Sequence, residues 1–551
     1  MLIRLILLIC AFTTLAAQPV EANPNQEYSK LTALFEDWRK FETPPNYLGA
    51  PDYRAATFMK RHPEFITLRE RHNKISQTNF TVAEKVDWMI LWAEFNGYDF
   101  NQKVLKPWAR DPAFYKSVWT YKSDVPAHEG PTHHAVTELW TYTFPLSAAE
   151  QLRLIKDLEV IPAINEQAKI NLTGNAKELW VAGIRDIKTQ KTVLEKLNKD
   201  VNDYATPQLK GAIDKAVSST SALTRWLEQQ AKLKTGPSGI SKELYSWYLN
   251  NVHLVPLSWQ DEVRLLQREL DRAWSSLKLE EHRNRHLPPM ISAESPEEYN
   301  KLAEQSVQSF MRFLKQQDIV TVADYFEPAL RKHMGQYVPK KTRHFFYIAS
   351  HYDPRPLYSH FYHWFELARM ENSPNKRLIR RDPLLYNIFD SRNEGTATAV
   401  EEIFMHAGLY DDSPRSRELV WIMLAQRAAR GLGSLYAHAN DMTMQDAGKI
   451  HSDWTPRGWM KTEPELLLFE QHLYLRQPGY GTSYVTGKYL LERTMAQYGK
   501  MKEAQNKSFV LKEFMDELNT IGSIPILLGH WQLTGDDRLV KKILANYKPI
   551  K

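Results

Sequence analysis

In the stretch Asp390-Ser391-Arg392-Asn393-Glu394-Gly395-Thr396-Ala397-Thr398-Ala399-Val400-Glu401-Glu402, the carboxylates of Glu394 and Glu401 are seven residues apart with no charged residue between them. At 3.6 residues per turn, positions i and i+7 of a helix nearly superimpose, so both glutamates are expected on one face. The small residues between them predict close approach of a neighbouring helix. The stretch is predicted to form one wall of a buried polar site; the alternative is a solvated acidic face with interhelical salt bridges.

Helical periodicity continues on both sides of this stretch. Apolar residues recur at spacings of three and four, for example over residues 88–93 and 419–435, and strand-like alternation is scarce. Ser147, followed by Glu150, and Ser258, followed by acidic residues, are typical of helix starts with a capping box. These patterns predict a mostly α, large two-lobed helical protein.

Three segments are expected along the chain. Arg4, an apolar run and Val20-x-Ala22 are typical of a signal peptide over residues 1–22, so the protein is predicted to be periplasmic or secreted. A turn cluster, Lys-Thr-Gly-Pro-Ser-Gly, separates an N-terminal helical lobe (23–235) from a C-terminal helical domain (239–551). No later segment approaches about 20 continuous apolar residues, so no stable membrane insertion is expected.

Composition excludes several classes of site. The only cysteine, Cys10, lies in the predicted signal, so disulfides, thiolate nucleophiles and cysteine zinc sites are not expected in the mature protein. Ile9 is not the small residue expected before a lipid-attached cysteine. A metal ion would need His, Asp or Glu ligands. The formal charge of +6 without a long Lys/Arg run argues against nucleic acid binding.

Two histidines are candidate metal ligands. His360 and His363 are predicted in one helix at i and i+3, which places both imidazoles on one side. Glu394 is the expected third ligand; packed core histidines are the alternative. The segment His-Glu-Gly-Pro-Thr-His-His at 128–134 lacks the spacing of a zinc-protease helix, and is predicted to be a loop near a pocket.

Two later segments carry further candidate residues. Arg430 can clamp a carboxylate, or pair with a glutamate of the preceding helix, and His438 can act as a ligand or transition-state donor. The turn Gln477-Pro478-Gly479 leads into a helix in which Tyr484 can donate its phenolic proton to an oxyanion, or simply pack.

In this order, the segments resemble the bacterial family catalogued as domain of unknown function 885, whose members are often described as helical, zinc-peptidase-like exported proteins. The likeness covers roughly residues 239–530. Residues 239–249 resemble the segment that leads into the family's core, and residues 394–401 resemble its E-G-W-A-L-Y-A-E helix. In residues 427–438, Arg427, Arg430 and His438 match the family's R-A-x-R-L-V-V-D-x-G-x-H segment. Residues 477–487 are similar to its Q-P-G-x-x-x-S-Y-x-x-G segment, and residues 514–525 to its closing F-x-D…G…P pattern.

The chain departs from this family at its H-E-x-x-P-G-H-H segment, which in a zinc-peptidase reading supplies ligands and a general-base glutamate. The corresponding window, residues 357–364, matches only at His363; His360 is a nearby histidine and not a motif match. Thr396 stands where the family's helix has tryptophan, and Ser434 replaces its aspartate.

Two main functions follow. The first is an exported, peptidase-like hydrolase acting through a zinc-bound water. Its site would comprise His360, His363 and Glu394 as zinc ligands, Glu401 or Glu402 as base, His438 and Tyr484 at the oxyanion, and Arg430 on a substrate carboxylate. The second is a non-catalytic periplasmic relative that has lost its metal site and captures a ligand. A metal-independent hydrolase or lyase is a third. The expected partner is a peptide or small molecule; the sequence does not predict an oligomeric state.

Overall fold

The computed structural model describes residues 26–123, 135–384, 386, 390–460 and 464–550. Within these ranges the protein is mostly α, which confirms the predicted fold class. Two short two-stranded sheets are present: β1 (Asn46–Tyr47) pairs antiparallel with β2 (Ala50–Pro51), and β3 (Val118–Trp119) pairs parallel with β4 (Thr137–Glu138). The predicted signal peptide and the His-rich segment 128–134 lie outside the described residues.

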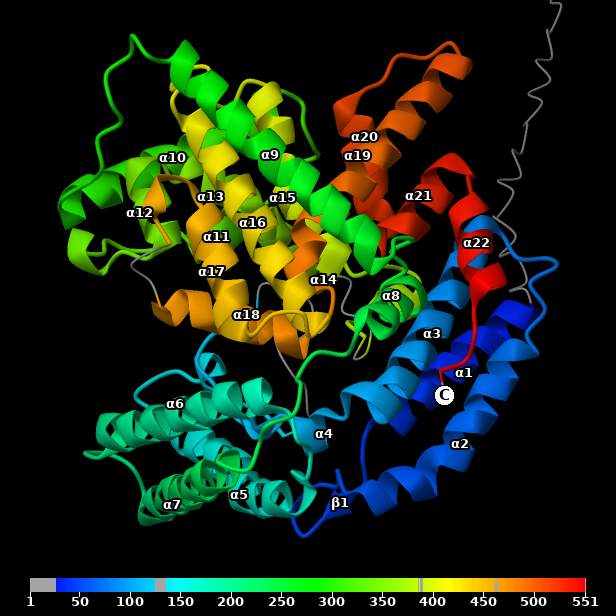
Figure 1. Cartoon of the computed structure of the whole chain (residues 1–551), viewed down its shortest axis with the longest axis vertical. Coiled ribbons are helices and arrows are strands. Elements are labelled where there is room, and N and C mark those ends of the chain that lie inside the picture. The colour runs from blue at the N-terminus through cyan, green and yellow to red at the C-terminus, as the bar shows by residue number, and fades with distance from the viewer. Residues whose placement is uncertain (1–25, 124–134, 385, 387–389, 461–463, 551) are drawn as a thin grey trace, which may run out of the picture.

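The N-terminal part forms two separate groups of helices in Figure 1, one with α1 to α3 and one with α5 to α7. Its helices are α1 (Gln26–Glu42), α2 (Ala55–Asn73), α3 (Val82–Phe100), the π-helix η1 (Asn101–Leu105), α4 (Pro107–Arg110), η2 (Pro112–Tyr115), η3 (Leu139–Thr141), α5 (Ala148–Asn171), α6 (Lys177–Val201) and α7 (Pro207–Ala231).

The rest of the described chain forms a larger helical body above α5 to α7 in Figure 1. Its helices are α8 (Lys242–Asn251), α9 (Trp259–Arg283), α10 (Pro296–Gln316), α11 (Phe326–Arg331), η4 (Lys340–Thr342), α12 (Phe345–Tyr352), α13 (Arg355–His360), α14 (Tyr362–Asn372), η5 (Leu378–Arg380), α15 (Asp390–His406), α16 (Ser416–His438), α17 (Met444–Trp454), η6 (Pro456–Gly458), α18 (Pro464–Arg476), α19 (Tyr480–Ala504), α20 (Leu511–Ile521), α21 (Ile526–Thr534) and α22 (Arg538–Asn546).

Local sequence signals account for several helix starts. The Ser147 side chain accepts from the backbone of Glu150, whose carboxylate accepts from the Ser147 backbone, so the predicted capping box is confirmed. The box at Ser258 is closed by Asp261. Two N–H groups at each of these ends thus have side-chain partners, which stabilises the first turn.

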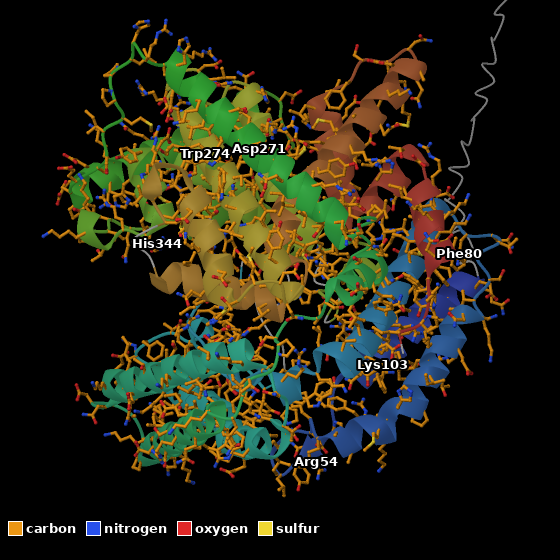
Figure 2. All side chains as sticks on the ribbon, in the orientation of Figure 1. Arg54, Phe80, Lys103, Asp271, Trp274 and His344 are labelled. Atoms are coloured by element: carbon orange, nitrogen blue, oxygen red, sulfur yellow. The ribbon has the colours of Figure 1, made fainter. Side chains whose placement is uncertain are left out.

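The first and last helices of the described residues share one hydrophobic core. Trp38 of α1 and Phe95 of α3 belong to the same buried cluster as Leu528 and Trp531 of α21. A polar contact also joins η1 to the C-terminal segment: the ammonium of Lys103, labelled in Figure 2, donates to the Ile550 carbonyl at 2.9 Å. This packing crosses the predicted boundary near residue 235; the division into two domains stays a prediction.

Buried ion pairs attach the α5–α7 group to the larger body. Arg476, at the end of α18, lies 2.9 Å from the Asp111 carboxylate and 2.5 Å from that of Asp186 on α6. Both partners are almost fully buried, as is Arg476. Such contacts fix the orientation of the group, since charge-assisted bonds in a low dielectric are strong and directional.

Helices α15 and α19 cross at two glycines in the middle of the larger body. A Cβ atom placed on Gly487 would lie 2.6 Å from the Gly395 Cα, nearer than any ordinary contact, and would also meet the Ser391 carbonyl oxygen. Close approach through small residues was predicted for this helix, and the geometry confirms it. The crossing brings Glu394 on α15 beside the first turns of α19.

Among the described residues, no helix combines the length and the apolar character needed to cross a bilayer.

Candidate metal centre

His360 and His363 lie on two consecutive short helices. The prediction of one continuous helix was wrong here: α13 ends at His360 and α14 begins at Tyr362, because Phe361 has ψ near 10° and departs from helical geometry. The chain turn still leaves the imidazoles together, with ring centroids 5.1 Å apart. Both side chains are buried.

Glu394 and Glu401 of α15 hold His360 from two sides. The Glu394 Oε2 atom lies 3.3 Å from His360 Nε2, and Glu401 Oε1 lies 2.8 Å from His360 Nδ1. Both carboxylates are almost fully buried. The i, i+7 spacing therefore places both glutamates on one inward face, as predicted, and the solvated acidic face does not form.

Burial and charge act in opposite directions on these groups. Burial is the largest influence on His360 and lowers its pKa, as does Arg427, but hydrogen bonds to Glu394 and Glu401 outweigh both and raise that pKa above its ordinary value. Burial raises the pKa of Glu394, but His360 and Tyr480 bring it down to about 2. Burial lowers the pKa of His363 to about 3, so its imidazole is neutral at ordinary pH.

Two tyrosines of α19 orient the Glu394 carboxylate. The Tyr480 hydroxyl donates to Glu394 Oε1 at 2.7 Å, and the Tyr484 hydroxyl donates to the same oxygen at 3.0 Å. The other oxygen, Oε2, faces His360. Tyr484 was predicted as an oxyanion donor, whereas Tyr480 was missed, although it directly follows the turn at residues 477–479 and lies one helical turn before Tyr484.

The arrangement fits a divalent metal ion. His360, His363 and Glu394 each offer one ligand atom, and these atoms all lie within 4.8 Å of one another. A zinc site with two imidazoles and one carboxylate is a common type. Glu401 on His360 Nδ1 reproduces the carboxylate–histidine contact that orients a metal-binding imidazole, and the tyrosines support Glu394 similarly.

Two arginines of α16 pair with buried carboxylates. Arg427 Nη1 donates to Glu401 Oε2 at 2.6 Å, and Arg430 Nη1 donates to Glu470 Oε1 at 2.5 Å. The Arg430 guanidinium also lies over the Tyr484 ring, 4.0 Å from its centroid. The glutamate that pairs with Arg430 comes from α18, later in the chain. Glu470 was missed by sequence reasoning; its only signal is an acidic residue directly after the apolar run 466–469.

His438 lies away from the residues that surround Glu394. Its Nε2 atom is 2.8 Å from the Tyr474 carbonyl oxygen, and its ring packs 5.3 Å from the Tyr245 ring. Burial lowers its pKa to about 4. These contacts describe a packed histidine at the end of α16.

Glu402, next to Glu401 in sequence, belongs to a second ionic cluster. Arg272 of α9 donates to both its carboxylate oxygens at 2.8 Å, and the Lys488 ammonium lies 3.0 Å from one of them. Burial raises the pKa of Glu402, but these cations lower it to about 2. The cluster ties α15 to α9 and α19 beside the candidate metal centre.

The stability of the protein is therefore expected to fall with acid through Glu402. A lowered folded-state pKa contributes stability that is complete above the ordinary value of 4.5 and is lost as pH falls toward about 2. From pH 7 to pH 3 this group should account for a loss of about 2 kcal/mol. Urea unfolding at both pH values should show a smaller decrease for Glu402→Gln than for the unmodified protein. Glu503→Gln, exposed on α19, should leave the decrease unchanged; equal decreases in all three proteins would contradict the assignment.

No known family model matches this chain, and no curated protein matches it. Two solved structures share its fold. One, from Shewanella oneidensis, is described as a "putative lipoprotein of unknown function"; it is 16% identical, with 93% of this chain and 100% of that chain covered, at a TM-score of 0.67. The other, described as a "putative lipoprotein" from Colwellia psychrerythraea, is 14% identical, with 95% of this chain and 98% of that chain covered, at a TM-score of 0.59.

These neighbours correct the functional prediction. The prediction of a metal-dependent, peptidase-like hydrolase was wrong: the proteins that share the fold are described as lipoproteins and not as hydrolases, which favours the non-catalytic alternative. The contacts agree, because Glu401, the expected base, has one oxygen on Arg427 and the other on His360. The resemblance to domain of unknown function 885 stays a prediction.

Proposed function

We propose that this protein is an exported, envelope-associated binding protein that holds a divalent metal ion, zinc being the first candidate, and does not turn over a substrate. The observation that carries the proposal is the convergence of His360, His363 and Glu394, whose ligand atoms lie within 4.8 Å of one another. Export is supported by the predicted signal peptide and by the lipoprotein description of both structural neighbours.

The proposal keeps the main point of the ligand-binding alternative and differs from it in retaining the metal ligands. The family's H-E pair is absent from residues 357–364, but His360 offers an imidazole beside His363. The departure from the motif of domain of unknown function 885 therefore changes which histidine can bind the metal ion. Three candidate metal ligands are still present.

Each neighbouring residue has a positioning role in this proposal. Glu401 holds His360 by Nδ1, so that Nε2 faces Glu394, and Arg427 in turn fixes Glu401. Tyr480 and Tyr484 fix one oxygen of Glu394. A zinc ion bound here would supply positive charge to offset the Glu394 carboxylate and would polarise one further ligand.

Groups that a hydrolase would need for proton transfer and charge stabilisation already have protein partners. Arg430 pairs with Glu470, and the Tyr484 hydroxyl donates to Glu394. Because buried charge pairs are costly to break, these side chains are held in place and are poorly suited to changing partners during a reaction. This supports binding without turnover.

The test is metal content by elemental analysis and zinc titration by calorimetry, on protein purified without chelator. We expect about one zinc ion per chain, lost in His363→Ala and in Glu394→Gln. Glu401→Gln should weaken binding about ten- to hundredfold, because it removes the group that orients His360. Circular dichroism spectra should show that each variant is folded.

Matched controls are available on the same helices. His406→Ala changes an exposed histidine of α15, and Glu492→Gln changes a half-exposed glutamate of α19. Both should bind zinc like the unmodified protein. Absence of zinc after addition of excess metal, or equal binding by His363→Ala, would overturn the proposal.

A further inference from the structure

A large cleft lies between the end of α14, η5, and helices α20 and α21. Its volume is about 710 Å³, within the range of about 300–1,000 Å³ typical of small-molecule sites. Glu366 of α14 and Arg392 of α15 line it, together with Asn519 at the end of α20. None of the three candidate metal ligands lines it.

The cleft carries an excess of positive charge. Five cationic side chains and two carboxylates line it, which leaves three positive charges over. The cationic residues are Arg369, Lys376, Arg377, Arg380 and Arg392. Low-dielectric walls that carry one sign of charge concentrate the field and attract ions of the other sign.

The two carboxylates of the cleft are already neutralised by the protein. Glu366 lies 2.5 Å from Arg392, and Asp516 accepts from the Lys512 ammonium at 2.6 Å and from Thr321. Arg377 and Arg380 share Asp87, which does not line the cleft. The excess of positive charge in the cleft therefore comes from the cations that these pairs do not neutralise.

Arg369 and Lys376 supply two of these three charges at the mouth of the cleft. Among the described residues, no carboxylate forms a salt bridge with either; the Arg369 guanidinium lies over the Phe326 ring, 5.4 Å from its centroid. Lys376 is exposed, and Arg369 is half-buried. Their positive charges are therefore available to a ligand.

Polar atoms at the buried end of the cleft are also available. Arg392, 1% exposed, donates from Nη1 to Thr396, but its Nε has no hydrogen-bond partner within the described parts of the chain. Asn519, 7% exposed, donates to the Tyr362 hydroxyl, and its Oδ1 has no partner there either. Most buried polar groups are hydrogen-bonded, so these two atoms remain open to a ligand or to water.

We propose that this cleft binds a small, soluble organic anion with two or more oxyanion groups, carboxylate or phosphate. Four of the five cations are arginines, whose planar forks match carboxylate and phosphate oxygens in pairs. The charge excess of three selects a multiply charged ligand over a single carboxylate. Arg392 can donate to an oxyanion at the buried end, and Arg369 and Lys376 meet the exposed end. Asn519 Oδ1 is an acceptor and takes part only where the ligand also carries a hydroxyl group.

The test is calorimetric titration of the full mature chain with three probes: citrate, pyrophosphate and the neutral polyol sorbitol. The protein is first treated with chelator and dialysed, so that citrate and pyrophosphate cannot act by binding a metal ion. We expect at least one of the two anions to bind, more weakly as ionic strength rises, and sorbitol not to bind. The preferred anion identifies the oxyanion class.

Variants locate the bound anion. Arg369→Gln and Lys376→Gln should each weaken binding about tenfold, the effect of losing one charge-assisted contact. Arg264→Gln and Lys449→Gln remove exposed cations elsewhere and serve as matched controls that should bind normally. Glu394→Gln, which removes a candidate metal ligand, should also bind normally. Absence of anion binding, or equal binding by the Arg369 and Lys376 variants and their controls, would overturn the inference.

Discussion

Arg427→Met is expected to lower the free energy of unfolding by about 3–5 kcal/mol, because it leaves a buried carboxylate without its cation. Arg427 and Glu401 are each 1% exposed, and their contact is 2.6 Å long. Methionine fills most of the arginine volume, so the cost comes mainly from the charge. The loss also removes one influence that lowers the pKa of His360, so His360 should hold its proton to higher pH.

Urea unfolding at neutral pH measures this effect, and a double-mutant cycle assigns it. The variant Arg427→Met/Glu401→Gln removes both charges and should be less destabilised than Arg427→Met alone. Arg283→Met removes an exposed arginine whose partner carboxylate lies 3.9 Å from the guanidinium. This change should alter the free energy of unfolding by no more than about 0.5 kcal/mol. Purely additive effects in the cycle would show that the pair is not coupled.

Gly487→Val is expected to destabilise the protein by about 3 kcal/mol or more, since overpacking against rigid groups is costly. The atoms that a Cβ would meet belong to the backbone of α15, at Ser391 and Gly395, and cannot rotate away. The two helices would have to separate. This would also draw Tyr484 away from Glu394, so the variant should lose zinc affinity along with stability.

Gly499→Ala, on the same helix, is the matched control. A Cβ there meets its nearest neighbour, Phe509, at an ordinary 3.8 Å. Alanine is the better helix former, so this variant should be more stable by about 0.5–1 kcal/mol. Thermal unfolding of both variants tests the contrast, and a Gly487→Val protein as stable as the unmodified one would disprove the close crossing.

The inward face of α15 could be predicted because helical spacing alone determines it. Glu394 and Glu401 lie two turns apart, and the small residues between them have no other strong role than to admit a neighbouring helix. The same periodic logic predicted the fold class and the capped start at Ser147. Such features depend only on residues near one another in sequence.

The partners of the charged side chains could not be predicted in this way. Arg430 pairs with Glu470, 40 residues later, and only the packing of α16 against α18 brings them together. The break at Phe361 was missed because helices flank it on both sides and no glycine or proline marks it. Which acidic side chain pairs with which basic side chain depends on how the helices cross. The spacing of residues along one sequence does not show how helices cross.

The core shared by α1–α3 and α21 has a consequence for biosynthesis. While the ribosome is still adding residues, the apolar faces of the first three helices lack the last part of their packing, so that region cannot close until the chain is nearly complete. Contacts between segments so distant in sequence form slowly. For an exported protein, as proposed above, this delay would keep the polypeptide in the open state that a translocation channel requires.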